Sequence, residues 1–170
     1  MGLFGWFSST KKPDPGTAVL SRPELEKALL ALNRDTAPYG LGPGDDEGVD
    51  LIAQWKIVDV AWYEIFAKAG LKKVYKIYMR LDEEHKQVRA VDREYEVSWR
   101  AGAPSLSLAA KAFRGQSRSI QFGMGVVFTE ELKPGLVYKY RFSTKELKDP
   151  IIRTVLASGW AYKPVVFGRL

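Results

Sequence analysis

The amino-acid sequence predicts an α+β fold: a curved antiparallel β-meander, forming a half-barrel or barrel of about seven to nine strands, with a helix at each end. Apolar and polar residues alternate with a period of two in a series of short runs, which Gly-, Pro- and Asp-containing turns separate. Apolar residues recur instead at helical spacing before the first run and after the last. We expect one domain over residues 17–170, preceded by an apolar, aromatic segment and a Pro/Gly linker over residues 1–16.

The N-terminal helix is expected to begin after Ser21, because Ser21 and Glu24 have the spacing of a capping box. Asn33 can end this helix. Its apolar positions lie three or four residues apart: Leu25, Ala28, Leu29 and Leu32. The Pro and Gly residues of 38–48 then predict a loop that is neither helix nor strand. That loop lacks the Lys-Ser/Thr pair of a phosphate-binding loop.

The meander is predicted from alternating runs at 51–58, 73–81, 87–91, 94–100, 106–112, 120–128 and 136–142. Turns are predicted at 82–86, 102–104, 114–117 and 133–135. Residues 59–69 fit either a short helix or a strand. An antiparallel sheet of this kind buries one face against a core and turns polar residues outward on the other.

The C-terminal helix has two possible starts, at Ser143 and at Asp149, and is expected to end at Gly159. Its apolar stripe consists of Ile151, Ile152, Val155 and Leu156. Such a stripe must be buried, so we expect the helix to pack on or in the concave face of the sheet. Residues 164–167 follow as a short edge strand.

The sequence offers little material for catalysis or for metal binding. Among 170 residues there is no Cys and one His, which excludes disulfides and thiolate chemistry. His85 lies in a charged turn, where a solvated side chain is the expected state, and no Gly-x-Ser-x-Gly motif is present. We expect no catalytic residue, no metal and no cofactor. An enzyme with substrate-supplied chemistry beneath the C-terminal helix stays a further hypothesis.

Positive charge is concentrated in the C-terminal part of the chain. Residues 101–170 contain eleven basic and four acidic side chains, and the net charge of the whole chain is +6. Lys139, Arg141 and Lys145 form a candidate basic patch for an anionic partner. The alternative is an ordinary solvated surface, since the charges alternate with apolar residues.

Nucleic-acid binding is an alternative that the sequence disfavours. Lys76, Tyr78 and Arg80 share one strand face, and basic residues interleaved with aromatic ones can bind phosphates and stack bases. However, the tyrosines beside Lys139 and Arg141 fall on the opposite strand face from them, and no RNA-recognition motif is present.

The first residues combine aromatic side chains with two lysines. Trp6 and Phe7 could lie at the headgroup level of a membrane, with Lys11 and Lys12 on anionic phosphates. The alternative is a terminus that packs on the domain or stays disordered. No run of eighteen apolar residues exists, and the segment lacks the features of a secretory signal. We therefore expect a cytoplasmic protein, with a peripheral membrane position as the accompanying hypothesis.

Three stretches, at 50–70, 89–92 and 159–170, are similar to a small bacterial family of uncharacterised proteins, and this resemblance implies no activity. The order of elements, a meander followed by an apolar helix, also resembles in layout the tubby-like and scramblase-like barrels. Those barrels wrap a sheet around a buried helix and include phosphoinositide binders. The chain contains no motif specific to them, so the likeness is one of layout and carries no function.

The sequence therefore favours a non-catalytic binding module for an anionic membrane surface or an apolar ligand. The expected partners are anionic lipid or another protein. A protein–protein or self-assembly module that uses an exposed edge at 164–167 is the first alternative, and nucleic-acid binding through basic strand faces is the second.

Overall fold

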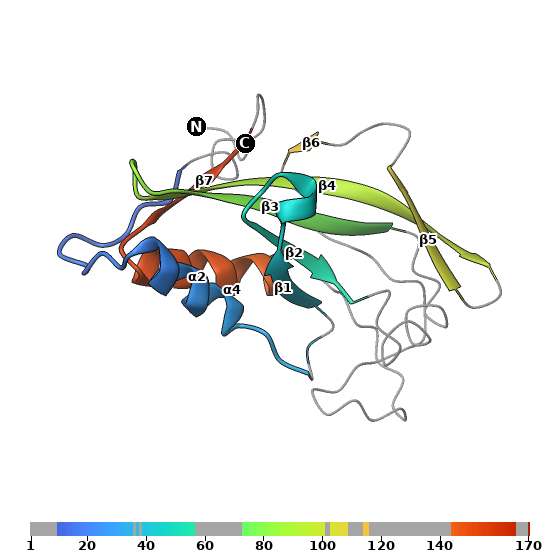
Figure 1. Ribbon diagram of the computed structural model, residues 1–170, viewed down its shortest axis with the longest axis horizontal. Coiled ribbons are helices and arrows are strands. Elements are labelled where there is room, and N and C mark those ends of the chain that lie inside the picture. Colours follow the sequence, from blue (N-terminus) through green and yellow to red (C-terminus); the bar gives the residue numbers. More distant parts are fainter. Residues whose placement is uncertain are drawn as a thin grey trace.

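Figure 1 shows the protein as a computed structural model, which describes residues 10–35, 37, 39–56, 73–100, 103–108, 114–115, 144–165 and 170. Its helices are α2 (Arg22–Leu30) and α4 (Thr144–Ala157), and η1 (Asp45–Glu47) is a short 3-10 turn. Its strands are β1 (Tyr39–Pro43), β2 (Leu51–Trp55), β3 (Lys73–Asp82), β4 (Gln87–Arg100), β5 (Ala103–Leu108), β6 (Arg114–Gly115) and β7 (Ala161–Pro164).

The described strands belong to one sheet, in which β1, β2, β3, β4 and β5 follow one another antiparallel. The second edge of β4 pairs in turn with β7, β6 and β5, and only the β7 pairing is parallel. This path does not close on itself. The prediction of an α+β fold with a mostly antiparallel sheet is confirmed, whereas the barrel alternative is wrong for the described strands.

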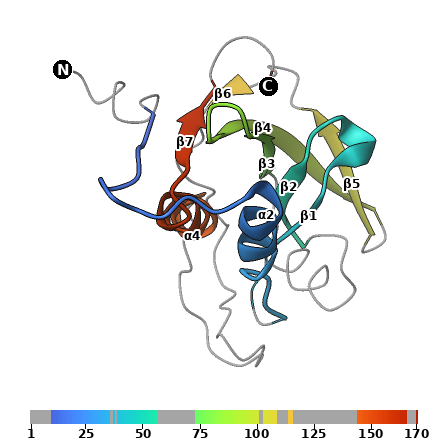
Figure 2. The same cartoon turned by 60° about the vertical axis from the view of Figure 1, so that its left-hand side comes forward.

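Both helices pack on the same side of the sheet, which we call the helix face (Figure 1, Figure 2). The core on that face includes Leu25, Leu29, Leu41, Ala53, Ile77, Met79, Ala90, Leu147, Ile151, Val155 and Tyr162. A smaller cluster on the opposite side, the outer face, consists of Ile52, Tyr78, Val91 and Val165. The expected packing of the C-terminal helix on the sheet is therefore confirmed.

The prediction of a loop over 38–48 is wrong, because this segment contains β1 and η1. Local propensity does not favour a strand here, but pairing with β2 supplies backbone hydrogen bonds that stabilise one. Glycines are tolerated because β1 is an edge strand. Asn33 holds β1 in place after the turn from α2. Its Nδ2 donates to the Leu41 carbonyl at 2.8 Å, and its Oδ1 accepts from the Leu41 N–H at 2.7 Å.

Two predicted strands, 87–91 and 94–100, form the single strand β4. A charged residue, Asp92, lies between them on the helix face, and an ion pair with Lys148 of α4 allows it to be buried there. Ala103 and Arg114, which the sequence places in turns, instead pair with β4 as parts of β5 and β6. The elements predicted at 59–69, 120–128 and 136–142 lie outside the described residues.

The C-terminal strand β7 begins earlier than the predicted 164–167, and its middle is not an open edge. Tyr162 and Lys11 exchange two backbone hydrogen bonds of 2.9 Å each, on the side of β7 away from β4. Pro164 is buried, and Phe167 lies outside the described residues. The pairing with Lys11 covers β7 at Tyr162, outside the 164–167 edge of the self-assembly hypothesis, which stays a prediction.

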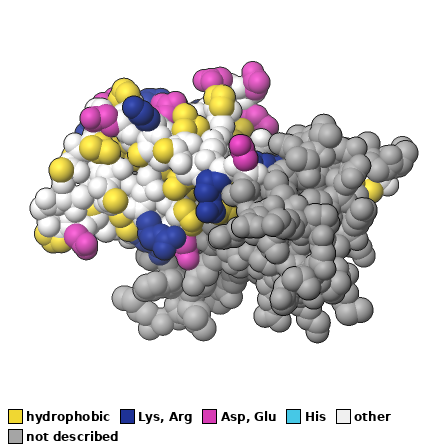
Figure 3. All heavy atoms as spheres, turned by 90° about the horizontal axis from the view of Figure 1, so that it is seen from below, with side chains coloured by type: hydrophobic (Ala, Val, Ile, Leu, Met, Phe, Trp, Pro, Cys, Tyr) yellow, Lys and Arg dark blue, Asp and Glu magenta, His cyan; other side chains and the backbone are white. Residues whose placement is uncertain are grey.

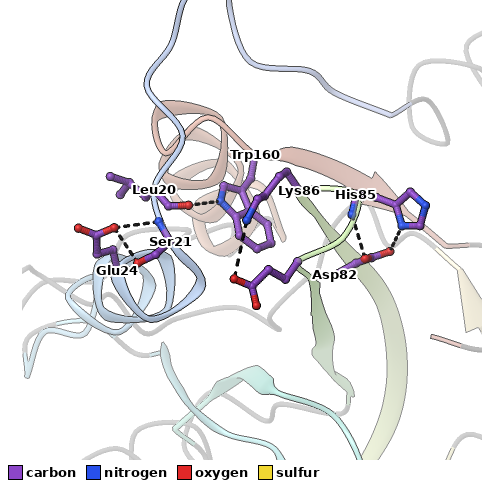
Figure 4. A network of polar contacts seen from close by, with 8 residues as sticks. Leu20, Ser21, Glu24, Asp82, His85, Lys86 and Trp160 are labelled. Carbon is purple, nitrogen blue, oxygen red and sulfur yellow. Dashed lines mark hydrogen bonds and ion pairs between the residues drawn. The ribbon is translucent and has the colours of Figure 1, made fainter.

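Figure 4 shows how Trp160 joins three distant parts of the chain. Its side chain is fully buried, and its Nε1 donates to the Leu20 carbonyl at 2.9 Å. The Lys86 ammonium, from the hairpin between β3 and β4, lies 5.2 Å from the Trp160 ring centroid. Beside this junction, the backbone N–H and the Oγ of Ser21 both donate to the Glu24 carboxylate, so the predicted helix start is confirmed.

A buried polar group lies between α4, β4 and β7. Lys148 Nζ donates to Asp92 Oδ2 at 2.5 Å, and the two side chains are 13% and 1% exposed. Tyr162 is fully buried on the same face of the sheet, and its hydroxyl has no hydrogen-bond partner among the residues that the structure describes. Its burial, and secondarily the Asp92 charge, raise the pKa of Tyr162 well above the usual value.

We expect Tyr162→Phe to keep the free energy of unfolding at pH 7 within about 1 kcal/mol of the wild type, because the lost hydroxyl has no hydrogen-bond partner in the described part of the chain. The raised folded-state pKa means that wild-type stability falls as pH rises above the unfolded tyrosine pKa of about 10. Replacing Tyr162 with phenylalanine removes the part of this pH-dependent loss of stability that Tyr162 causes. Urea unfolding at pH 7 and pH 10.5 measures both effects, with Tyr39→Phe as the control. A loss above about 2 kcal/mol at pH 7 would contradict the assignment.

Candidate anion-binding surface

The pairing of β3 with β4 places basic residues directly opposite one another on the outer face. Lys76 faces Arg93, and four residues further along β3, Arg80 faces Arg89. The parallel pairing of β7 with β4 then sets Lys163 beside Arg89. We call these five residues the cationic strip. Like charges directly opposite one another destabilise a sheet unless opposite charges offset their repulsion.

Two tyrosines flank the Lys76 and Arg93 pair, Tyr78 on the side of Arg80 and Arg89 and Tyr95 on the opposite side. Lys76 Nζ is 5.0 Å from the ring centroid of Tyr95, and the Arg93 guanidinium is 4.9 Å from that of Tyr78. The hydroxyls of these tyrosines are hydrogen-bonded to each other. Burial and this bond raise the pKa of Tyr78, which therefore stays neutral. The rings hold the basic side chains on the sheet by cation–π contact.

Tyr78 itself is 1% exposed, so its ring is closed to a nucleotide base. The sequence correctly groups Lys76, Tyr78 and Arg80 on one strand face, which the register confirms. Their use for base stacking, however, requires an accessible ring. The part of the outer face that the structure describes therefore provides positive charge without an open stacking platform at Tyr78.

At the end of the strip, Arg80 and Arg89 line a cavity of about 480 Å³. The other lining residues are Arg22, Asp45, Gly48, Val49, Asp50, Leu81, Asp82 and Leu170. Arg80 donates to the Gly48 carbonyl at 2.6 Å, and a neutral carbonyl does not cancel the positive charge of the guanidinium. Three acidic residues share this cavity with the arginines: Asp50 pairs with Arg22 at 2.8 Å within the lining, Asp82 pairs with His85 at 2.9 Å, and Asp45 is the third.

The structure brings two of the sequence-predicted site residues close to the strip. Lys11 pairs with Tyr162, the neighbour of Lys163, and Lys12 follows it with an exposed side chain. Lys145 lies in α4, on the helix side of the sheet and away from the strip. The remaining predicted site residues, Trp6, Phe7, Lys139 and Arg141, lie outside the described residues.

Sequence reasoning missed the contribution of Arg89, Arg93 and Lys163. The sequence did contain a signal for Arg89 and Arg93. The predicted turn at 82–86 sets residue 82 opposite residue 87, and this register places 80 opposite 89 and 76 opposite 93. Lys163 carried no such signal. Its parallel pairing with β4 joins segments more than seventy residues apart, through a connection that no local pattern specifies.

Other functional features were also sought in the described part of the chain. It contains no group of three or more His, Cys, Asp or Glu side chains arranged to hold a metal ion. None of its helices has the length and apolar character needed to cross a membrane. Comparisons with known proteins find no matching family model, no matching curated protein and no matching solved structure.

Proposed function

We propose that this protein is a non-catalytic binding module for an anionic membrane surface, and that the cationic strip contacts the lipid headgroups. The observation that carries the proposal is the register of β3 and β4, which sets Lys76 opposite Arg93 and Arg80 opposite Arg89. Like charges opposite one another repel, and a layer of phosphates above them would offset that repulsion and attract the surface to a membrane.

A membrane fits this surface better than a nucleic acid does. The strip extends over three neighbouring strands, so its charges are spread across the sheet rather than along one groove. The buried Tyr78 removes the stacking contribution on which single-stranded nucleic-acid binding depends. Lys12 adds an exposed positive charge past β7, whereas Lys11 shares the sheet face of its partner Tyr162. In this proposal Trp6 and Phe7 enter the headgroup region beside Lys12, and the protein is a cytoplasmic, peripheral one.

Flotation with vesicles tests the proposal. Wild-type protein is expected to bind vesicles of phosphatidylcholine with phosphatidylserine, to bind pure phosphatidylcholine much less, and to dissociate at high salt. Each cation near an anionic surface contributes about 1 kcal/mol. Arg80→Gln with Lys163→Gln should therefore weaken vesicle binding by about 2 kcal/mol, or about thirtyfold. Both side chains are exposed, so folding should be preserved.

A charge-matched control separates the strip from the overall charge. Lys27→Gln removes one exposed cation from α2, on the helix side, and should bind vesicles as the wild type does. Lys163→Gln removes one exposed cation from the strip and should weaken binding severalfold. Equal losses in these two single variants would show that net charge alone matters. Equal binding to neutral and anionic vesicles would reject the proposal outright.

A further inference from the structure

A second cavity lies on the helix side of the sheet, away from the cationic strip. It has a volume of about 340 Å³ and opens between the C-terminal end of α2, the edge strand β1 and the helix α4. Its lining residues are Ala31, Leu32, Arg34, Tyr39, Leu41, Leu147, Pro150 and Arg153. We call it the helix-side pocket. Its volume lies at the lower end of the range for small-molecule sites, so a small ligand fits it best.

Six of the eight lining residues of the helix-side pocket have apolar or aromatic side chains, and several of these are firmly held. Leu41 and Leu147 belong to the core, with 7% and 2% of their surfaces exposed. The Tyr39 ring packs edge-on against Trp55, with 5.8 Å between ring centroids and an interplanar angle of 87°. The two hydrogen bonds from Asn33 fix β1 relative to the end of α2. A pocket held in this way loses little entropy when a ligand enters.

Two arginines from different elements give the pocket its charge. Arg34 follows α2 and Arg153 lies in α4, and among the described lining residues no acidic side chain opposes them. Neither guanidinium forms an ion pair with any carboxylate that the structure describes, although Asp35 and Asp149 are close in sequence. Lys56 adds a third cation nearby, since its Nζ donates to the Arg34 carbonyl at 2.9 Å.

The surface view from below is consistent with this arrangement. Figure 3 shows basic side chains lying next to hydrophobic ones on the helix side of the molecule. An apolar cavity beside unpaired guanidinium groups is complementary to a molecule with an apolar body and one anionic end. Guanidinium binds a carboxylate through two parallel hydrogen bonds, which gives direction as well as affinity.

We infer that the helix-side pocket binds a small amphipathic carboxylate. Its apolar body lies against Leu32, Tyr39 and Leu147, and its carboxylate binds Arg34 and Arg153. This inference does not depend on the membrane proposal, because the two sites lie on opposite faces of the sheet and share no residue. The protein would then hold a free organic acid on one face while its other face meets lipid headgroups.

Calorimetric titration with three probes tests the chemistry of the ligand. Octanoate carries both an apolar body and a carboxylate, whereas octanol lacks the charge and propanoate lacks most of the apolar body. Octanoate is expected to bind at least tenfold more tightly than either, because each half of the site contributes. Equal affinity for octanoate and octanol would overturn the role of the arginines. The absence of octanoate binding at millimolar concentration would overturn the site itself.

Variants then assign the binding to named residues. Arg34→Gln with Arg153→Gln should weaken octanoate binding at least tenfold and leave octanol binding unchanged. Both side chains are exposed, so folding should be preserved. Lys27→Gln, an exposed change on α2 outside the pocket, should bind octanoate as the wild type does. Unchanged octanoate affinity in the double variant would reject the inference.

The two proposals can fail separately. The Arg34→Gln and Arg153→Gln variant should bind anionic vesicles as the wild type does, because the cationic strip is intact. The Arg80→Gln and Lys163→Gln variant should bind octanoate as the wild type does. Loss of octanoate binding in the strip variant, with the fold unchanged by circular dichroism, would contradict the assignment of the carboxylate to the helix-side pocket.

Discussion

Lys148→Met is expected to destabilise the fold by about 3–5 kcal/mol, one of the two largest effects of a single substitution that we anticipate. The Asp92 carboxylate is 1% exposed, and the Lys148 ammonium is its partner across the interface between α4 and β4. Methionine fills a similar volume, so packing should change little. The loss arises because the buried Asp92 carboxylate then lacks the Lys148 ammonium.

Urea unfolding of the single and double variants measures this effect. Adding Asp92→Asn to Lys148→Met should recover a large part of the lost free energy, because the buried group is then neutral. Lys27→Met, on the exposed side of α2, serves as the control and should change the free energy of unfolding by less than about 0.5 kcal/mol. A loss below about 1 kcal/mol in Lys148→Met would show that Asp92 does not depend on this ion pair.

Gly159→Ala is expected to destabilise the fold by about 2–6 kcal/mol, through two separate causes. The glycine has φ of +76°, a conformation that costs a non-glycine residue about 1–3 kcal/mol. An added Cβ would also lie 2.6 Å from the Ala18 carbonyl oxygen and 2.8 Å from the Val19 Cα. These are backbone atoms and cannot turn away, so overpacking adds about 1–3 kcal/mol.

Two other glycines separate the causes. Gly16 has φ of +84° with no atom within 4 Å of a built Cβ, so Gly16→Ala should show the conformational cost alone. Gly42 has neither a positive φ nor a close neighbour, and Gly42→Ala should be nearly neutral. Thermal and urea unfolding should therefore rank the losses as Gly159 above Gly16 above Gly42. A loss at Gly159 no larger than that at Gly16 would show that the Ala18–Val19 backbone moves aside.

Local sequence patterns were sufficient to predict the helices and strands whose buried residues recur at regular spacing along the chain. The capping box of Ser21 and Glu24, the alternation in β3, and the apolar stripe ending at Gly159 all predict their elements correctly. The segment 38–48 is different, because β1 depends on pairing with β2 and on the distant side chain of Asn33. The glycines and prolines of this segment disfavour regular secondary structure locally, but tertiary hydrogen bonds override that preference.

The candidate sites depend even more on long-range geometry. Strand alternation alone places Lys76 and Arg80 on one face, but the repulsive pairs exist only once the register with β4 is known. The helix-side pocket brings Arg34 and Arg153 together from segments that are more than one hundred residues apart. No periodicity or motif in the sequence predicts that these two arginines lie close together, since their proximity follows from how α2 and α4 pack on the sheet. The strands predicted at 120–128 and 136–142 stay predictions.

The junction around Trp160 has a consequence for how the chain folds. The hairpin of β3 and β4 needs only a short turn, so it can form early and locally. The contacts of Lys11 with Tyr162 and of Leu20 with Trp160 close loops of about 140–150 residues, and closure of such loops carries a high entropic cost. On a ribosome Lys11 and Leu20 are made first and must wait until Trp160 and Tyr162 have been synthesised. We therefore expect slow, late docking of the two chain ends, with the hairpin as the early nucleus.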